Sequence, residues 1–172
     1  MALLDIIIAP DPRLKQKAKP VDAVDDSVRQ LMDDLLETMY KAQGIGLAAT
    51  QVGDLRRVLV MDLAPEGAPP SPMRLANPEV IETSTKINSY EEGCLSLPDH
   101  YAEVKRPATI KLRYLDEQNE IRELEADGLL ATCVQHEIDH LDGKIFVDHV
   151  SSLKRNMILR KLTKTKKAGV AV

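Results

Sequence analysis

The chain has 172 residues, 44% of them hydrophobic and 29% charged, and a net charge of −4. This size and composition fit one domain with a hydrophobic core and do not require two. No apolar stretch approaches the ~20 residues that span a bilayer, and residues 1–10 lack the basic start of a signal peptide. Because Cys94 and Cys133 are the only cysteines, a disulfide framework is disfavoured and we expect a cytoplasmic protein with no membrane partner.

The first predicted element is a helix over residues 26–43. Its apolar side chains recur at helical spacing, and Gly44 follows where a helix-ending glycine is expected. Residues 56–63 are β-branched and apolar, which predicts a strand. Residues 64–73 contain four prolines and a glycine, so we expect a surface loop there.

Two further strand-like runs, 108–115 and 120–126, flank a turn and predict a β-hairpin. A second helix is expected at 129–142, with Asp127 as its N-cap and Gly143 at its end. Its first two turns are apolar nearly all round, so it should be buried. With a third helix at 151–164, the pattern predicts an α+β fold: antiparallel β-sheets packed around the buried helix, with an N-terminal and a C-terminal helix.

The strongest motif is the sequence HEIDH at 136–140, within the buried helix. Its spacing puts His136 and His140 on one helix face, one turn apart, where they can share a metal ion. Glu137 lies about 100° round the helix from His136, so it can reach a water on the metal rather than the metal. Two unrelated surface histidines are disfavoured, because unpaired imidazoles on a buried helix are costly.

A catalytic metal site of this type needs a third protein ligand and an open fourth position. The two common metalloprotease arrangements are disfavoured, since Glu137 is the last glutamate and Phe146 stands where a third histidine would follow. Cys133 would stretch the ligand set ~10 Å along the helix axis, so a packing role is expected for it. The other candidates, which we interpret as helix-end, loop or surface groups, are His100, Asp142, Asp148 and His149.

Cys94 is the favoured third ligand. It lies beside Gly93 in the sequence EGCLS at 92–96, where the backbone can approach closely and present a thiolate from outside the helix. A third motif, GIGLAATQ at 44–51, follows the first helix. A phosphate loop is disfavoured there because the motif lacks Lys-Ser/Thr and leaves a helix instead of opening one. Its Gln51 carries an amide that can donate to an oxyanion.

These three motifs, in this order, resemble those of the peptide deformylase family: G-x-G-L-A-A-x-Q, E-G-C-L-S and H-E-x-x-H. The last motif alone is moderately specific, whereas all three in order are highly specific. The resemblance runs from the first helix to the basic C-terminal helix and is to the bacterial type with a helical C-terminus. It implies a metal-dependent hydrolase that removes the N-formyl group from the initiator methionine of nascent polypeptides, releasing formate.

The resemblance also implies the ligands and their metal. One divalent ion is expected per chain, with Fe(II) native and Zn(II), Ni(II) or Co(II) able to take its place. The implied metal ligands are Cys94, His136 and His140. Glu137 is implied as the general acid/base, and Gln51 with the Leu95 backbone N–H as the oxyanion site.

Substrate is implied to bind as an extended strand, with the methionine side chain in an apolar pocket. The residues implied to contact it are Gly44, Ile45, Gly46, Tyr90, Glu92, Gly93, Tyr101, Leu129 and Cys133. Tyr90 and Tyr101 depart from the family, where an aliphatic residue and an arginine are common. With the variable Asp99 and His100, they leave specificity beyond the methionine open.

Two other functions compete with this interpretation. A metallopeptidase could use the same three ligands, and it would cleave internal peptide bonds. A ribosome- or RNA-binding protein could hold a structural metal without catalysis. The second alternative needs a fourth protein ligand, and the sequence offers no good one.

The last part of the chain is strongly basic. Residues 151–172 contain seven Lys or Arg and no acid, whereas the other 150 residues hold 16 basic and 27 acidic side chains. We expect residues 1–150 to form a single catalytic metallohydrolase domain and residues 151–172 a basic helix or tail of it. The charge predicts contact with ribosomal RNA, with a merely solvated helix as the alternative. We expect a monomer.

Overall fold

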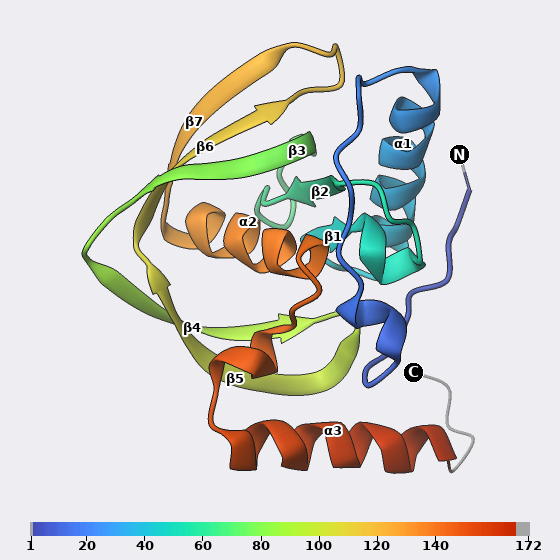
Figure 1. The fold of residues 1–172 in the computed structure, drawn as a ribbon, viewed down its shortest axis with the longest axis vertical. Helices are drawn as coiled ribbons and strands as arrows, with labels where there is room; N and C mark the ends of the chain where they lie inside the picture. Colours follow the sequence, from blue (N-terminus) through green and yellow to red (C-terminus); the bar gives the residue numbers. More distant parts are fainter. Residues whose placement is uncertain (1, 168–172) are drawn as a thin grey trace.

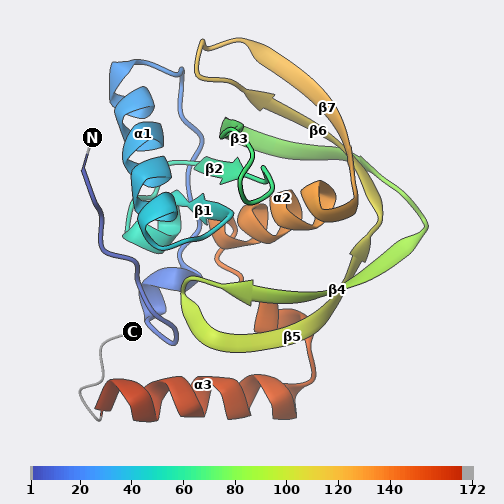
Figure 2. The same ribbon diagram turned by 180° about the vertical axis from the view of Figure 1, so that it is seen from behind.

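The computed structural model describes residues 2–167, so residues 168–172 of the predicted tail lie outside it. Within the described range the chain forms three α-helices, seven β-strands and three 3-10 helices around the central helix α2 (Figures 1 and 2). In chain order these are η1 (Pro12–Lys15), α1 (Asp26–Lys41), β1 (Gly46–Ala48), η2 (Ala49–Val52), β2 (Val58–Asp62), β3 (Pro72–Thr83), β4 (Ile87–Cys94), β5 (Leu97–Pro107), β6 (Thr109–Leu115), β7 (Ile121–Asp127), α2 (Gly128–Leu141), η3 (Phe146–His149) and α3 (Ser152–Lys167).

The strands form two antiparallel sheets, which lie on opposite sides of α2 (Figure 1). The large sheet has the order β1-β2-β3-β6-β7, and the small sheet pairs β4 with β5. β1 is therefore an edge strand of the large sheet, and β4 keeps one unpaired edge in the small sheet. Unpaired strand edges offer backbone N–H and C=O groups to any extended segment that lies beside them.

β2 is buried along its whole length because helices cover both of its faces. Val58 and Val60 lie in a hydrophobic cluster with α1, while Leu59 and Met61 lie in a second cluster with Val134 of α2. Strands covered on both faces have continuous apolar sequences rather than alternating ones. This burial holds the large sheet between α1 and α2.

Helix α3 packs beside the small sheet. Its Ile158 and Leu162 are 4% and 2% exposed and share a hydrophobic cluster with Val104 of β5 and Phe146 of η3. The basic helix is thus part of the packed molecule (Figure 2). Within residues 2–167 no helix is both long enough and apolar enough to cross a bilayer.

The expected α+β architecture is confirmed, and α1, β2, the β6–β7 hairpin, α2 and α3 match predicted elements. The expectation for Gly44 is wrong, because Gln43 holds the left-handed conformation after α1, with φ 59°. Gly44 instead contacts the Leu95 side chain, since a Cβ there would lie 2.6 Å from Leu95 Cδ1. Asp127 occupies the N-cap position of α2, but its side chain accepts no hydrogen bond from the helix. The predicted loop ends earlier than expected, since β3 begins at Pro72.

Candidate active site

Three metal-binding side chains converge between α2 and the end of β4. Cys94 Sγ lies 3.2 Å from His140 Nε2, which lies 3.3 Å from His136 Nε2. All three donor atoms lie within 4.8 Å of one another. Tetrahedral ligands 2.0–2.3 Å from an ion are roughly 3.3–3.6 Å apart, so this spacing fits a single ion. We call Cys94, His136 and His140 the metal triad.

The local fold explains how Cys94 reaches the helix. The register of β4 and β5 shifts between Gly93 and Cys94, so Cys94 pairs directly with Leu97 across a tight turn. Irregularities of this kind redirect a side chain at the end of a ladder. The Tyr101 ring packs over Gly93, where a Cβ would lie 2.6 Å from Tyr101 Cε1 and would displace the ring.

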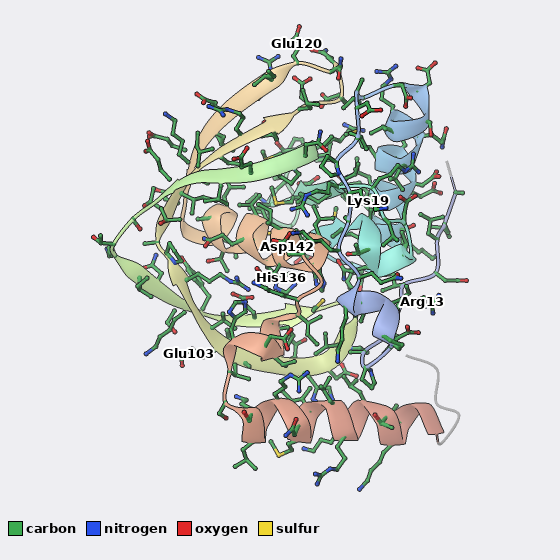
Figure 3. The ribbon with its side chains drawn as sticks, in the orientation of Figure 1. Arg13, Lys19, Glu103, Glu120, His136 and Asp142 are labelled. Atoms are coloured by element: carbon green, nitrogen blue, oxygen red, sulfur yellow. The ribbon has the colours of Figure 1, made fainter. Side chains whose placement is uncertain are left out.

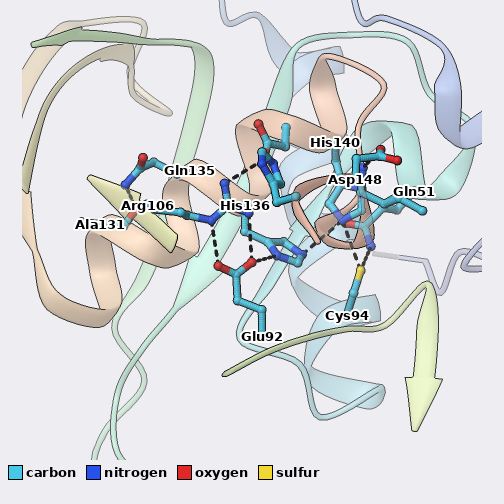
Figure 4. Close-up of polar contacts among 12 residues, drawn as sticks. Gln51, Glu92, Cys94, Arg106, Ala131, Gln135, His136, His140 and Asp148 are labelled. Atoms are coloured by element: carbon cyan, nitrogen blue, oxygen red, sulfur yellow. Dashed lines mark hydrogen bonds and ion pairs between the residues drawn. The ribbon is translucent and has the colours of Figure 1, made fainter. Parts of the chain in front are cut away.

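A pair of buried charges orients His136 (Figure 4). The imidazole Nδ1 lies 2.9 Å from Glu92 Oε1, which leaves Nε2 directed toward the other two donors. Arg106 of β5 donates to both oxygens of Glu92, at 2.7 and 2.9 Å. Metal-binding histidines are commonly fixed by a carboxylate on the second ring nitrogen. Figure 3 shows His136 in the interior, whereas Glu103 of β5 points outward.

Arg106 also binds a second carboxylate. Its Nη1 donates to Asp139 Oδ2 at 2.8 Å, and His149 Nε2 lies 2.7 Å from the same oxygen. Burial alone would raise the pKa of Asp139, but the hydrogen bonds from His149 and Arg106 more than offset it and lower the pKa. His149 is a surface imidazole, as expected, but its side chain, 33% exposed, also reaches Asp139 of α2.

The other rejected ligand candidates lie away from the metal triad. Asp142 pairs with Arg57 at 2.9 Å, and Asp148 Oδ2 accepts from the Ile145 N–H at 2.9 Å. His100 lies in strand β5 and not in a loop, which corrects the expectation. It lines the cavity described below.

Glu137 is the buried carboxylate next to the metal triad. Glu137 is 4% exposed, and burial raises the pKa of its side chain to about 7. Among the described residues, Glu137 Oε1 and His140 Nδ1 are two of three buried side-chain atoms without a hydrogen-bond partner. Such atoms are rare in folded proteins, and the Glu137 oxygen indicates a place for a further polar group beside the metal triad. His140 Nδ1 lies on the far side of its ring, because Nε2 faces the other two donors. A Cβ on Gly46 would lie 2.4 Å from Glu137 Oε2, so β1 forms the wall opposite.

Both polar atoms of the Gln51 side-chain amide form hydrogen bonds. Its Oε1 accepts from the Ala48 N–H at 2.9 Å, and its Nε2 donates to Ser96 Oγ at 3.0 Å. The same Nε2 lies 3.5 Å from Cys94 Sγ. The amide N–H groups are therefore aimed at the end of β4, beside the metal triad (Figure 4).

A cavity of about 580 Å³ opens beside the metal triad. All nine residues expected to contact substrate line it, and so do Leu95, His136 and Glu137. Tyr101 and Leu129 lie at its exposed rim, at 59% and 49% exposure. Cys133 lies deep inside, where burial raises its thiol pKa well above the ordinary value. Glu92 does line the cavity, but both of its oxygens are engaged by Arg106 and His136.

The sequence interpretation missed Arg106, Asp139 and Ser96. Arg106 could have been found, because on β5 the buried positions alternate as Ala102, Val104 and Arg106. A charged residue at an inward position of such a pattern predicts a buried partner. Ser96 and Asp139 carry no comparable pattern.

Comparisons with known proteins identify the family of the chain. The polypeptide deformylase family model matches residues 3–156. The peptide deformylase of Brucella suis biovar 1 (strain 1330) is 54% identical over 164 residues, covering 95% of this chain and 94% of the relative. A crystal structure of peptide deformylase from Ehrlichia chaffeensis superposes with a TM-score of 0.93 at 37% identity, covering 99% of this chain and all of the other. A second, in complex with actinonin, gives 0.91 at 40%, covering 96% of this chain and 98% of the other. With a family model over most of its length and a relative more than half identical, the chain belongs to the polypeptide deformylase family.

Proposed function

We propose that the protein hydrolyses the N-formyl group of the initiator methionine of newly synthesised polypeptides and releases formate. The observation that carries this proposal is the position of Glu137, a buried carboxylate beside the three donors of the metal triad and on the wall of the cavity. Family membership and the activity in the relatives' names support it.

The reaction is the addition of water to a formamide carbon, followed by cleavage of its C–N bond. The metal triad would hold an ion, which when bound lowers the pKa of a water and polarises the carbonyl. Glu137 would take a proton from the attacking water and return it to the departing amine nitrogen. Its burial beside the metal triad suits a group that must accept and then donate a proton.

Two N–H donors would serve the formyl oxygen as negative charge develops on it. These are the Gln51 amide, which already points toward Cys94, and the backbone N–H of Leu95. A positioned donor of this kind is typically worth ~3 kcal/mol in the transition state. The fixed Gln51 Oε1 supports the assignment, because the amide needs no reorganisation to donate.

The peptide would bind as an extended strand between two free strand edges. β1 and β4 each have an unpaired edge, and both contribute residues to the cavity. Addition of a strand supplies main-chain hydrogen bonds, while pockets for alternate side chains provide specificity. The methionine side chain would enter the part of the cavity lined by Gly46, Leu129 and Cys133.

The activity is tested with a formyl-Met tripeptide and its acetyl-Met counterpart. We expect formate from the first, little acetate from the second, and no cleavage at internal peptide bonds. Mass spectrometry of the products separates these outcomes. Internal cleavage would favour a metallopeptidase, and absence of formate with each of Fe(II), Ni(II), Co(II) and Zn(II) would overturn the proposal.

The native ion is proposed to be Fe(II). A Cys/His/His donor set also accepts zinc, nickel and cobalt, so donor chemistry alone does not select the ion. Thiolate-bound Fe(II) is open to oxidation at the metal and the sulfur. We expect the iron form to lose activity in air and keep it under argon, while the nickel form is stable in both. Equal durability of the iron form in air would count against it.

The partner of the basic helix is proposed to be ribosomal RNA. Lys154, Arg160, Lys161 and Lys164 are exposed on α3, whereas Arg155 pairs with Asp148. Truncation is a poor test, because α3 buries Ile158 and Leu162 against the core. Glutamine substitutions at the four exposed cations should instead reduce ribosome co-sedimentation at low salt and leave tripeptide hydrolysis unchanged. Unchanged sedimentation would leave α3 as a solvated helix.

The control for that experiment removes the same number of exposed positive charges from the body of the protein. It carries glutamine at Lys15, Lys17, Lys86 and Lys105. Equal loss of co-sedimentation in both variants would mean that ribosome binding depends on the net charge of the protein and not on α3. We further propose one catalytic domain over residues 1–150 with the helix as its basic extension, a monomeric state and a cytoplasmic location; sedimentation velocity and cell fractionation test the last two.

A further inference from the structure

We propose that His149 is a positioning residue for the metal site, acting on His136 through Asp139, Arg106 and Glu92. This inference rests on the proposed function of the metal triad. It extends the site to η3, the segment that joins α2 to the C-terminal helix.

Four contacts connect His149 to the metal triad without a gap. His149 Nε2 lies 2.7 Å from Asp139 Oδ2, and Arg106 Nη1 lies 2.8 Å from that oxygen. Arg106 then donates to both oxygens of Glu92, and Glu92 Oε1 lies 2.9 Å from His136 Nδ1. Apart from His149, whose side chain is 33% exposed, the side chains in this chain of contacts are 5–18% exposed.

The balance of charge among these side chains explains why His149, the outermost of them, affects the metal site. Arg106 is a single cation between two carboxylates, Glu92 and Asp139. His149 donates to Asp139 and so supplies part of what that carboxylate needs. Without His149, Asp139 would compete more strongly for the guanidinium. The fork of Arg106 on Glu92 would then weaken, and with it the orientation of the His136 ring.

The segment of His149 has anchors other than His149. Asp148 is one, because its carboxylate accepts from the Ile145 N–H at 2.9 Å and from Arg155 Nε at 3.0 Å. Phe146 and Val147 anchor the same segment in the core. The His149 side chain instead leaves η3 to reach α2, which supports a role toward the metal site.

The test measures how fast a chelator removes zinc from the loaded full-length protein at one fixed pH. Loss of a direct outer-shell partner such as Glu92 typically costs about 10–100-fold in metal affinity. His149 lies three contacts beyond Glu92, so we expect a smaller effect, with His149→Ala releasing zinc about 3-fold faster. His149→Gln should restore slow release, because its amide can donate to Asp139 from a similar reach. The melting temperature of each metal-free variant is measured alongside.

The matched control is Arg155→Gln, which breaks the neighbouring ion pair of the same segment without touching Asp139. It should lower the melting temperature but release zinc at the wild-type rate. Wild-type release from His149→Ala, equal acceleration by both variants, or failure of His149→Gln to restore slow release would overturn the positioning role alone. A wild-type protein that retains no metal would overturn the metal site and this inference together.

Discussion

Of the two β-sheets in the described chain, only the small one buries an ion pair. In the large sheet, β2 and β6 bury apolar residues such as Leu59, Met61 and Leu112, each fully inaccessible. In the small sheet, β5 also buries apolar residues such as Val104, and β4 and β5 add the ion pair of Glu92 with Arg106, which contacts His136 of the metal triad. Both sheets face α2. The helix packs apolar residues against the large sheet and carries the two histidines of the metal triad next to the small sheet.

This difference gives the two sheets different roles: the large sheet mainly stabilises the fold, and the ion pair of the small sheet positions His136. Fully burying a large apolar side chain is worth about 1.5–3 kcal/mol, so the large sheet accounts for much of the folding free energy. A buried ion pair contributes little net stability, because desolvation offsets the attraction between its charges. Glu92 and Arg106 are therefore better explained by the position they give His136 than by the stability they add.

The largest predicted effect removes the chemistry and leaves both sheets intact. Glu137→Gln should lower turnover about 100- to 10,000-fold, the usual contribution of general acid–base catalysis. Metal content and melting temperature should stay near wild type, because Glu137 is not part of the metal triad. Formate release and metal analysis check this. Loss of the metal, or normal turnover, would contradict the proposed role.

The two cysteines compare the two sides of α2, because Cys94 ends β4 of the small sheet and Cys133 belongs to the apolar cluster of the large sheet. Cys94→Ser should weaken metal binding by more than the roughly 10–100-fold typical of an outer-shell partner, because a thiolate donor is lost. Cys133→Ser should retain one metal per chain, since its buried thiol packs against the apolar cluster. Competition with a chelator measures both. Comparable metal loss from the two variants would show that the ligand is wrongly assigned.

A second pair of variants compares the two sheets through substitutions that lower the free energy of unfolding by similar amounts. Arg106→Met leaves Glu92 and Asp139 without their cation and should lower the free energy of unfolding by about 3–5 kcal/mol. Leu112→Ala in the large sheet should cost about 2–5 kcal/mol. Only Arg106→Met should also release metal from the folded protein. Urea unfolding measures the stability of both variants, and metal analysis of the folded proteins distinguishes them. Equal retention of metal by the two variants would show that the Glu92–Arg106 ion pair does not position the metal site.

The smallest effect concerns a polar contact at the end of β2. The Tyr40 hydroxyl donates to Asp62; burial and this hydrogen bond raise the Tyr40 pKa to about 12. The contact should stabilise the fold by at most about 1 kcal/mol below pH ~10, the unfolded pKa, and this contribution is lost as pH rises toward about 12. Ultraviolet titration of wild type against Tyr40→Phe measures the pKa; a value near 10 would contradict the contact.

The same contact has a second limit in acid. Burial would raise the pKa of Asp62, but hydrogen bonds from Tyr40 and from the Ala64 and Ser71 N–H groups outweigh it and lower the pKa. Its contribution is therefore complete above the unfolded pKa of about 4 and is lost as pH falls through the lower folded value. Asp62→Asn should flatten this part of the acid unfolding curve. An unchanged curve would mean that Asp62 is equally acidic in both states.

The sequence was informative where burial is periodic. α1, α2 and β2 were predicted because their apolar residues follow one face of a helix or fill a strand buried on both faces. β4 and β5 were not resolved as a pair, because inward positions carry Glu92 and Arg106, which disguise the alternation. The metal triad followed from helical spacing and motif order. The contacts of Asp139 with Arg106 and His149 join residues 33 and 10 positions apart, and no local pattern encodes them.

The metal triad also has a mechanical consequence. Cys94 and His140 are 46 residues apart in sequence, and an ion shared between them would close that length of chain into a loop. A covalent bridge of this length restricts the unfolded chain by about 4 kcal/mol in the chain-entropy model. The ion would act as a reversible cross-link between β4 and α2. Chelation should therefore speed hydrogen exchange in β4 and β5 first, while β2 and β6 keep their protection.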